Sequence, residues 1–210
     1  DRRIAAGRHH LKSCMELLGQ PTSWLEIAAA ASGMAGVWLT IRRSILCFPI
    51  GTASVALYIF VFTGADVRLY ADALLQGCFF VLLAYGWANW KRSRQQPDQP
   101  ASQMSSAEWL KAVPITLLTA ILIGWVFHRY TDASLPWLDA ALTAISLTAQ
   151  WMVAKKKIEN WWLWILVNLV YVPFYLYKGL ALTATLYLIF LIMAISGLKA
   201  WKLPAERTTS

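Results

Sequence analysis

The chain has 210 residues, of which 58% are hydrophobic and 14% are charged, and its formal net charge is +8. A soluble domain usually contains about 45–50% apolar and about 25% charged residues, so the composition excludes an ordinary soluble domain. The apolar residues form blocks of membrane-spanning length, and the positive charge lies in short segments between them. This pattern is typical of membrane topology and not of nucleic-acid binding. We therefore predict an all-α membrane protein.

Seven apolar runs predict seven transmembrane helices. They cover residues 24–41, 47–63, 69–90, 109–128, 137–154, 161–177 and 180–199. Pro49 and Pro136 suit the starts of helices, whereas Pro173 lies inside the sixth run and should kink it. The N-terminal segment, residues 1–20, lacks the apolar region of a cleavable signal peptide.

A polar stretch divides the chain into two halves. This stretch, KRSRQQPDQPASQMSSAE at 91–108, is rich in charge, Pro, Gln and Ser, and it predicts a flexible loop. We expect a first three-helix repeat at 21–90, the loop at 91–108, a linker helix at 109–130, a second three-helix repeat at 131–202 and a tail at 203–210. Two parallel repeats are a known transporter plan, with the substrate at their interface.

An alignment of residues 70–90 with 181–201 favours the repeat. The identical pairs are Ala73/Ala184, Leu75/Leu186, Phe79/Phe190, Gly86/Gly197 and Trp90/Trp201. A coincidence of apolar composition is the alternative.

With seven helices, most Lys and Arg residues fall on the side of the membrane that holds the C-terminus. The positive-inside rule then places the N-terminus in the periplasm and the C-terminus in the cytoplasm.

Three residues of the sixth run, Trp161, Trp164 and Asn168, share one helix face, within an arc of about 60°. Asn168 lies about 10 Å deeper than Trp161 at the usual helical rise. A carboxamide at this depth either bonds a neighbouring helix or faces a cavity. Two indole rings and a carboxamide on the same face suit a flat aromatic ligand that carries an amide or hydroxyls. The indole faces would also attract a cationic ring. For Trp161 and Trp162, an interfacial aromatic belt is the alternative.

The third and seventh runs carry further polar residues at matching positions. Gln76 is a deep carboxamide, with Phe79 beyond it and Asp72 one turn before it, and the alignment pairs Gln76 with Tyr187 and Asp72 with Thr183. A central site between two halves needs such groups from both. Hydrogen bonding between helices is the alternative. Gln150, near the end of the fifth run, fits a packing role better.

Several absences narrow the chemistry. The sequence has no phosphate-binding glycine loop, no HExxH and no nucleophile motif, and its three cysteines match no metal or redox spacing. We therefore predict no catalytic residue, no metal site, no cofactor and no enzymatic activity. The middle parts of the helices have no Lys, Arg or acidic relay. This favours a phosphate-free polar or cationic substrate that moves down its gradient.

The segment ENWWLWILVN, which includes Trp161, Trp164 and Asn168, resembles the Trp-x-x-Trp-x-x-x-Asn signature of the PnuC family of bacterial vitamin transporters. LYADALLQ (69–76), YGWANW (85–90), WLE (24–26) and FPIGTASVALY (48–58) are similar to other helices of that family. The resemblance covers nearly the whole chain after residue 20. The segment 59–68, IFVFTGADVR, is longer than the family pattern.

The resemblance implies a fold similar to that of the SWEET sugar transporters and a homotrimer with one pathway per subunit. It implies facilitated diffusion of nicotinamide riboside, a pyridine nucleotide precursor, across the bacterial inner membrane. A cytoplasmic kinase then traps the vitamin by phosphorylation. Trp161, Trp164, Asn168 and Gln76 would line the site. Thiamine or riboflavin remains the alternative substrate, because the signature does not separate these vitamins.

Overall fold

The structure is a computed structural model that describes residues 14–17, 20–63, 70–93, 101–131 and 135–202. Within these residues the chain forms one hairpin and seven helices. These elements are β1 (Cys14–Leu17), β2 (Gln20–Ser23), α2 (Trp24–Ile41), α3 (Cys47–Thr63), α4 (Tyr70–Ser93), α5 (Ser106–Tyr130), α6 (Pro136–Ala154), α7 (Asn160–Tyr177) and α8 (Ala181–Lys202). The helices match the seven predicted runs, with ends that differ by no more than three residues. The antiparallel hairpin β1–β2 was not predicted.

The outer surface of the helices is that of a membrane protein. Helices α2, α5 and α8 are each long and apolar enough to cross a bilayer, and α3 is apolar but shorter. Large apolar side chains, such as Leu110, Ile121 and Trp125 of α5, are exposed on the outside. Such a surface is favourable in lipid, where the helical backbone satisfies its own hydrogen bonds. The prediction of an all-α membrane protein is confirmed, apart from the short hairpin.

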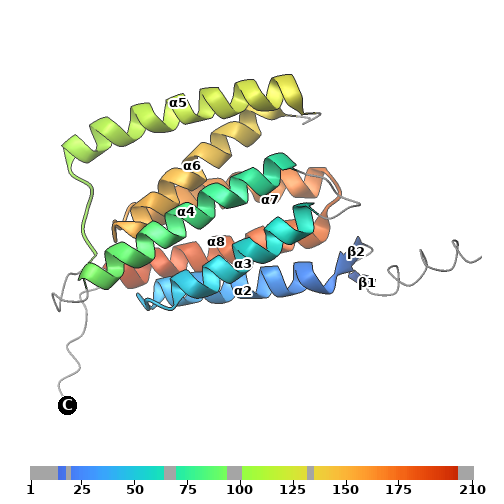
Figure 1. The fold of residues 1–210 in the computed structure, drawn as a ribbon, viewed down its shortest axis with the longest axis horizontal. Helices are drawn as coiled ribbons and strands as arrows, with labels where there is room; N and C mark the ends of the chain where they lie inside the picture. The colour runs from blue at the N-terminus through green and yellow to red at the C-terminus, as the bar shows by residue number, and fades with distance from the viewer. Residues whose placement is uncertain (1–13, 18–19, 64–69, 94–100, 132–134, 203–210) are drawn as a thin grey trace, which may run out of the picture.

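The helices before and after α5 form a ring. α2 packs on α3 and α3 on α4, while α6 packs on α7 and α7 on α8. Contacts of α4 with α6 and of α2 with α8 close the ring. α5 lies outside the ring and packs mainly against α6, as Figure 1 shows. The space inside the ring is therefore bordered by helices from both sides of the polar stretch.

Part of the polar stretch is fixed against the turn between α6 and α7. The backbone N–H of Ser102 donates to Lys156 O at 3.0 Å, and Ile158 N–H donates to Ser102 O at 3.0 Å. Met104 is buried, and its N–H donates to Glu159 Oε1. The composition predicted a flexible loop over 91–108. Instead, α4 continues to Ser93, residues 101–105 are docked, and residues 94–100 lie outside the described part of the chain.

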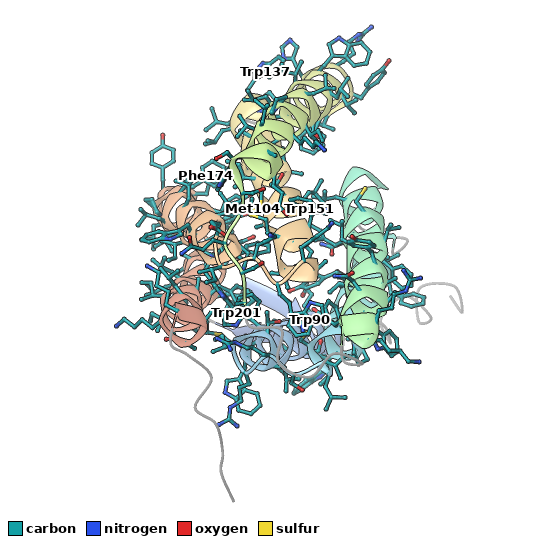
Figure 2. All side chains as sticks on the ribbon, turned by 90° about the vertical axis from the view of Figure 1, so that its left-hand side faces the viewer. Trp90, Met104, Trp137, Trp151, Phe174 and Trp201 are labelled. Carbon is teal, nitrogen blue, oxygen red and sulfur yellow. The ribbon has the colours of Figure 1, made fainter. Side chains whose placement is uncertain are left out.

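Two tryptophans join the halves at the end of the bundle where α2, α4, α6 and α8 finish. We refer to this as the tryptophan end and to the opposite end as the hairpin end; Figure 2 views the tryptophan end. Trp90 Nε1–H of α4 donates to Val153 O of α6, and Trp201 Nε1–H of α8 donates to Thr40 O of α2, both at 3.1 Å. Each acceptor is the penultimate residue of its helix. The two halves thus make reciprocal contacts.

Each of these tryptophans also packs on an aromatic ring from the middle helix of its own half. Phe48 of α3 meets Trp90 edge-on, with ring centroids 5.0 Å apart and planes at 84°. Trp161 of α7 meets Trp201 with centroids 5.4 Å apart and planes at 87°. Edge-to-face pairs of this kind are favourable beyond their buried area. Both rings come from the first residues of their helices, so the two arrangements correspond.

A glycine makes room for each of these rings. A Cβ atom at Gly86 would overlap the ring of Phe48, and one at Gly197 would lie 2.5 Å from Cη2 of Trp161. Both glycines lie four residues before the tryptophan of their own helix. The pair Gly86/Gly197, which the alignment matched, therefore has the same structural role twice.

A basic residue covers each tryptophan from the other half. Lys156 Nζ lies 5.1 Å from the ring centre of Trp90, and Arg43 Cζ lies 6.0 Å from that of Trp201. Both have left-handed backbone conformations, with φ of 54° and 55°. Burial lowers the pKa of both groups, and the charge of Arg43 further lowers the pKa of Lys156. Two cations thus lie within electrostatic reach of each other at the tryptophan end.

The variant Trp201→Phe should lower the thermal stability of the protein in detergent. Phenylalanine keeps most of the ring packing but removes the indole donor to Thr40 O, which still accepts from the N–H of Arg43. The loss is therefore that of one hydrogen bond, about 0.5–1.5 kcal/mol. Thermal unfolding followed by circular dichroism measures the change. The matched control is Trp162→Phe, because Trp162 is 53% exposed. Equal melting temperatures for the two variants would show that the Trp201 hydrogen bond contributes nothing.

Candidate functional site

A cavity of about 280 Å³ lies inside the helix ring. Every ring helix contributes to its lining, and none of the lining residues comes from α5. The lining consists of Gly33, Val37, Thr40, Ser54, Val55, Tyr58, Gln76, Phe79, Gln150, Val153, Trp161, Trp164, Asn168, Tyr187, Phe190 and Ala194. The volume is near the lower end of the range for small-molecule sites, about 300–1,000 Å³. The cavity therefore suits one small ligand held between the two halves.

Helix α7 presents the three residues of the predicted face, Trp161, Trp164 and Asn168, to this cavity. Asn168 is only 4% exposed, and its Nδ2 donates to Trp164 O, one turn back, at 2.7 Å. This bond fixes the orientation of the carboxamide. Its Oδ1 has no hydrogen-bond partner among the described residues, so it is left as an acceptor for a ligand.

The two indoles of this face differ in how much of them a ligand can reach. Trp161 is 1% exposed, because its ring is held between Gly197 and Trp201. Its Nε1 is buried and has no partner within the described residues. Trp164 is only half-buried. Trp164 therefore offers the more accessible ring face, and Trp161 forms a rigid wall.

Two further carboxamides line the cavity, Gln76 of α4 and Gln150 of α6. Within the described residues neither side chain forms a hydrogen bond. Unpaired polar groups in an apolar region are costly unless water or a ligand satisfies them. With Asn168, three ring helices thus supply a carboxamide to one space.

Aromatic rings cover the cavity at the hairpin end. The ring of Tyr187 lies 4.7 Å from that of Tyr171 and 5.1 Å from that of Tyr175, measured between centroids. Tyr187 and Tyr175 are nearly parallel, with planes at 15°. Phe79 and Phe190 line the cavity below them. Aromatic side chains, Tyr187 at the hairpin end and Trp161 at the tryptophan end, therefore border the ligand space at both ends.

Six of the eight predicted site residues line the cavity. These are Trp161, Trp164, Asn168, Gln76, Tyr187 and Phe79. Asp72 lies near the start of α4, but its side chain is outside the described part of the chain. Thr183 lies on α8, one turn before Tyr187, and is not among the lining residues.

Sequence reasoning missed several lining residues, chiefly Gln150, Tyr58 and Phe190. The sequence favours a packing role for Gln150, whereas the structure places it in the cavity lining without a hydrogen-bond partner among the described residues. A usable signal existed for Phe190, because the alignment had paired it with the predicted site residue Phe79. For Tyr58 no comparable signal was available, since its helix reads as uniformly apolar.

Counted from the tryptophan end, ten of the sixteen lining residues form five pairs at equal positions of the two halves. These pairs are Thr40 and Val153, Val37 and Gln150, Val55 and Asn168, Phe79 and Phe190, and Gln76 and Tyr187. Only the phenylalanine pair is identical. At three of the five positions, one half has a polar side chain where the other has a valine.

The lining carries no charged side chain: it includes no Lys, Arg, His, Asp or Glu from any of the described residues. Two basic groups of the tryptophan end, Lys156 and Arg43, lie against Trp90 and Trp201 and are not part of the lining. A phosphate group in this cavity would have no cationic partner and would be costly to desolvate.

An uncharged cavity inside a ring of membrane helices is the architecture of a multi-pass membrane transporter for a small molecule. The comparisons with known proteins agree. The family model for the nicotinamide mononucleotide transporter matches residues 23–203, and the chain belongs to this family.

Curated relatives and a solved structure extend the match over most of the chain. The nicotinamide riboside transporter PnuC of Escherichia coli (strain K12) is 24% identical over an alignment of 209 residues, and the match covers 87% of each chain. The riboflavin/roseoflavin transporter RibM of Streptomyces davaonensis is 25% identical over 195 residues, or 91% of this chain and 90% of the relative. The crystal structure of the vitamin B3 transporter PnuC superposes with a TM-score of 0.67 at 23% identity, and the match covers 85% of this chain and 80% of that chain.

Proposed function

We propose that the chain carries nicotinamide riboside across the bacterial inner membrane by facilitated diffusion. The observation that carries this proposal is the uncharged cavity lined by Trp164, Asn168 and Gln76. Nicotinamide riboside combines a flat cationic ring, which indole faces attract, with a carboxamide, which Asn168 and Gln76 can pair. The relative from Escherichia coli supports this choice of vitamin.

The family description names the mononucleotide, whereas the Escherichia coli relative is named for the riboside. The cavity favours the riboside. A phosphate would need Lys, Arg or several donors around it, and the lining offers carboxamides and hydroxyls spread over different helices. We therefore expect the protein to refuse the phosphorylated form.

The same lining supports the proposal of facilitated diffusion. Coupling to protons or sodium usually relies on acidic or basic side chains inside the membrane, and the described lining includes no Asp, Glu, His, Lys or Arg. Net uptake then requires that the vitamin be removed on the inside, which phosphorylation by a cytoplasmic kinase would do. The chain itself is proposed to have no enzymatic activity.

For the transport step, we propose that two three-helix repeats, residues 21–90 and 131–202, rock about the cavity, with α5 as the linker. The reciprocal contacts of Trp90 and Trp201 support two equivalent halves. The tryptophan end is assigned to the cytoplasm and the N-terminus to the periplasm, because basic residues such as Arg43 and Lys156 gather at that end. A homotrimer with one pathway per subunit completes the proposal.

A riboflavin carrier is the second candidate, because the Streptomyces davaonensis relative is as similar to this chain as the Escherichia coli one. Thiamine also has a cationic ring that fits between aromatic side chains. Both alternatives keep the cavity and change the ligand.

Isothermal titration of the detergent-purified protein with the four ligands decides among these candidates. We expect binding of nicotinamide riboside and no detectable heat with nicotinamide mononucleotide, thiamine or riboflavin. Binding of the mononucleotide at least as tight as that of the riboside would contradict the role given to the uncharged lining. If only riboflavin or only thiamine binds, that vitamin would replace nicotinamide riboside as the proposed substrate.

A further inference from the structure

The outer surface of α7 and α8 carries an aromatic and basic cluster at the tryptophan end. Trp162, in the first turn of α7, is exposed and does not line the cavity, unlike the neighbouring Trp161. Lys202, the last residue of α8, lies over this exposed ring, with its Nζ 5.2 Å from the ring centre. Lys199 is also exposed and precedes Lys202 by three residues, so the two lysines lie within about 60° of each other around the helix. One indole ring and two ammonium groups thus share the outer surface.

The positive charge of this cluster is not balanced by the helices that carry it. Neither α7 nor α8 contains an Asp or Glu residue. Glu159 directly precedes α7, but its Oε1 accepts from the backbone N–H of Met104 and its Oε2 is buried. Lys199 and Lys202 form no salt bridge within the described part of the chain. An anionic group from outside the protein would therefore meet two available cations here.

Apolar stripes continue from the cluster along both helices. Leu166 and Leu169 follow Trp162 by four and seven residues, so they share its helix face, and both are exposed. The exposed stripe on α8 shares the helix face of Lys199 and consists of Ile195, Ile192 and Leu188. The two helices pack against each other, and both stripes run from the tryptophan end towards the middle of the bundle. Such a surface suits acyl chains below a headgroup.

The α7–α8 cluster differs from the other exposed pairs of a cation and an indole at this end. Arg42 lies over Trp38 at 4.9 Å, and Lys155 lies over Trp151 at 5.7 Å. The basic residue that follows each of these cations covers a tryptophan of the other half instead. Only the α7–α8 cluster, among these three, combines two exposed lysines on one helix with a tryptophan of its neighbour.

We propose that Trp162, Lys199 and Lys202 bind the headgroup of an anionic phospholipid, whose acyl chains lie along the apolar stripes of α7 and α8. The lipid phosphate accepts hydrogen bonds from the two ammonium groups, and the indole lies at headgroup level, where tryptophan is favoured. Basic side chains near the membrane surface attract anionic lipids in this way. The site lies outside the cavity, so it depends neither on the vitamin nor on the proposed function.

The test follows the melting temperature of the detergent-purified protein during titration with phosphatidylglycerol, or with phosphatidylcholine that has the same acyl chains. A ligand that binds the folded state raises the melting temperature, so the lipid concentration at half of the rise reports the affinity. The wild type should respond to phosphatidylglycerol at a lower concentration than to phosphatidylcholine. Lys202→Gln should raise the half-maximal phosphatidylglycerol concentration about fivefold, and Lys199→Gln/Lys202→Gln about 25-fold. The response to phosphatidylcholine should stay the same in all three proteins.

The matched control is Lys91→Gln/Arg92→Gln, which removes two exposed positive charges from α4 at the same end of the bundle. This control should respond like the wild type, and melting temperatures without added lipid establish that each variant is folded. An equal loss in the control would indicate general attraction to a basic surface and would overturn the site. An unchanged response of Lys199→Gln/Lys202→Gln would overturn it as well.

Inorganic phosphate distinguishes a lipid from a free anion. Titrated over the same concentrations, it should leave the melting temperature of the wild type unchanged, because the apolar stripes contribute only when acyl chains are present. A rise equal to that with phosphatidylglycerol would show that the cluster binds phosphate alone, and the lipid site would be wrong.

Discussion

The variant Asn168→Leu should lose nicotinamide riboside binding by a factor of about 100 or more while it remains folded. Leucine has the same branching and the same number of side-chain heavy atoms as asparagine but neither donates nor accepts, so a buried polar group of the ligand loses its partner. Such a loss costs about 1–3 kcal/mol, and the change in the adjoining Trp164 wall adds to it. Asn168 is 4% exposed, so water cannot easily take over its role.

Isothermal titration and a melting curve on the same preparation measure both parts of this prediction. The control is Gln103→Leu, because Gln103 is an exposed carboxamide outside the cavity and contacts Lys157 only through its backbone carbonyl. We expect the control to bind like the wild type. Unchanged affinity in Asn168→Leu would remove Asn168 from the site.

A single methyl group at Gly197 should have the second large effect. In Gly197→Ala the new Cβ would lie 2.5–2.6 Å from three ring atoms of Trp161, a separation that real structures do not tolerate. Trp161 is almost fully buried and packs on Trp201, so it cannot turn away without disturbing the tryptophan end. Overpacking of this kind costs about 1–3 kcal/mol, and the displaced indole also borders the cavity.

We therefore expect Gly197→Ala to lower the melting temperature and to weaken ligand binding together. Gly77→Ala is the matched control. Gly77 also lies inside a ring helix, α4, but a Cβ atom there meets nothing within 4 Å. Alanine favours a helix over glycine by about 1 kcal/mol, so the control should be neutral or slightly stabilising. A destabilisation of equal size in both variants would indicate a general effect of the substitution and not a clash with Trp161.

The helices of this fold were predictable because hydropathy reports directly on what each segment contacts. The seven runs and the face of Trp161, Trp164 and Asn168 follow from the number of residues per turn and from the length needed to cross lipid. These features depend on neighbours in the sequence, and a single sequence is sufficient to read them.

Other features depend on contacts between distant segments, and the sequence does not carry them in a readable form. The docking of Ser102 against the α6–α7 turn uses backbone groups, so composition alone pointed to a flexible loop. The place of Gln150 in the cavity lining depends on how distant helices pack around it, which its position in the sequence does not reveal. The matched glycines Gly86 and Gly197 were visible in the alignment, but only the structure shows that each makes room for an aromatic ring.

The corresponding contacts that the two halves make at the tryptophan end have a consequence for the orientation of a bound ligand. A cavity with two equivalent sides would bind an elongated ligand in two opposite orientations of equal energy. Here the side chains at equal positions differ: one half has Val37 where the other has Gln150, and Val55 where the other has Asn168. In the reversed orientation, the polar groups of the ligand would lie against valines, and the carboxamides of Gln150 and Asn168 would be unpaired. The difference between the two sides of the cavity therefore favours a single orientation of the bound ligand.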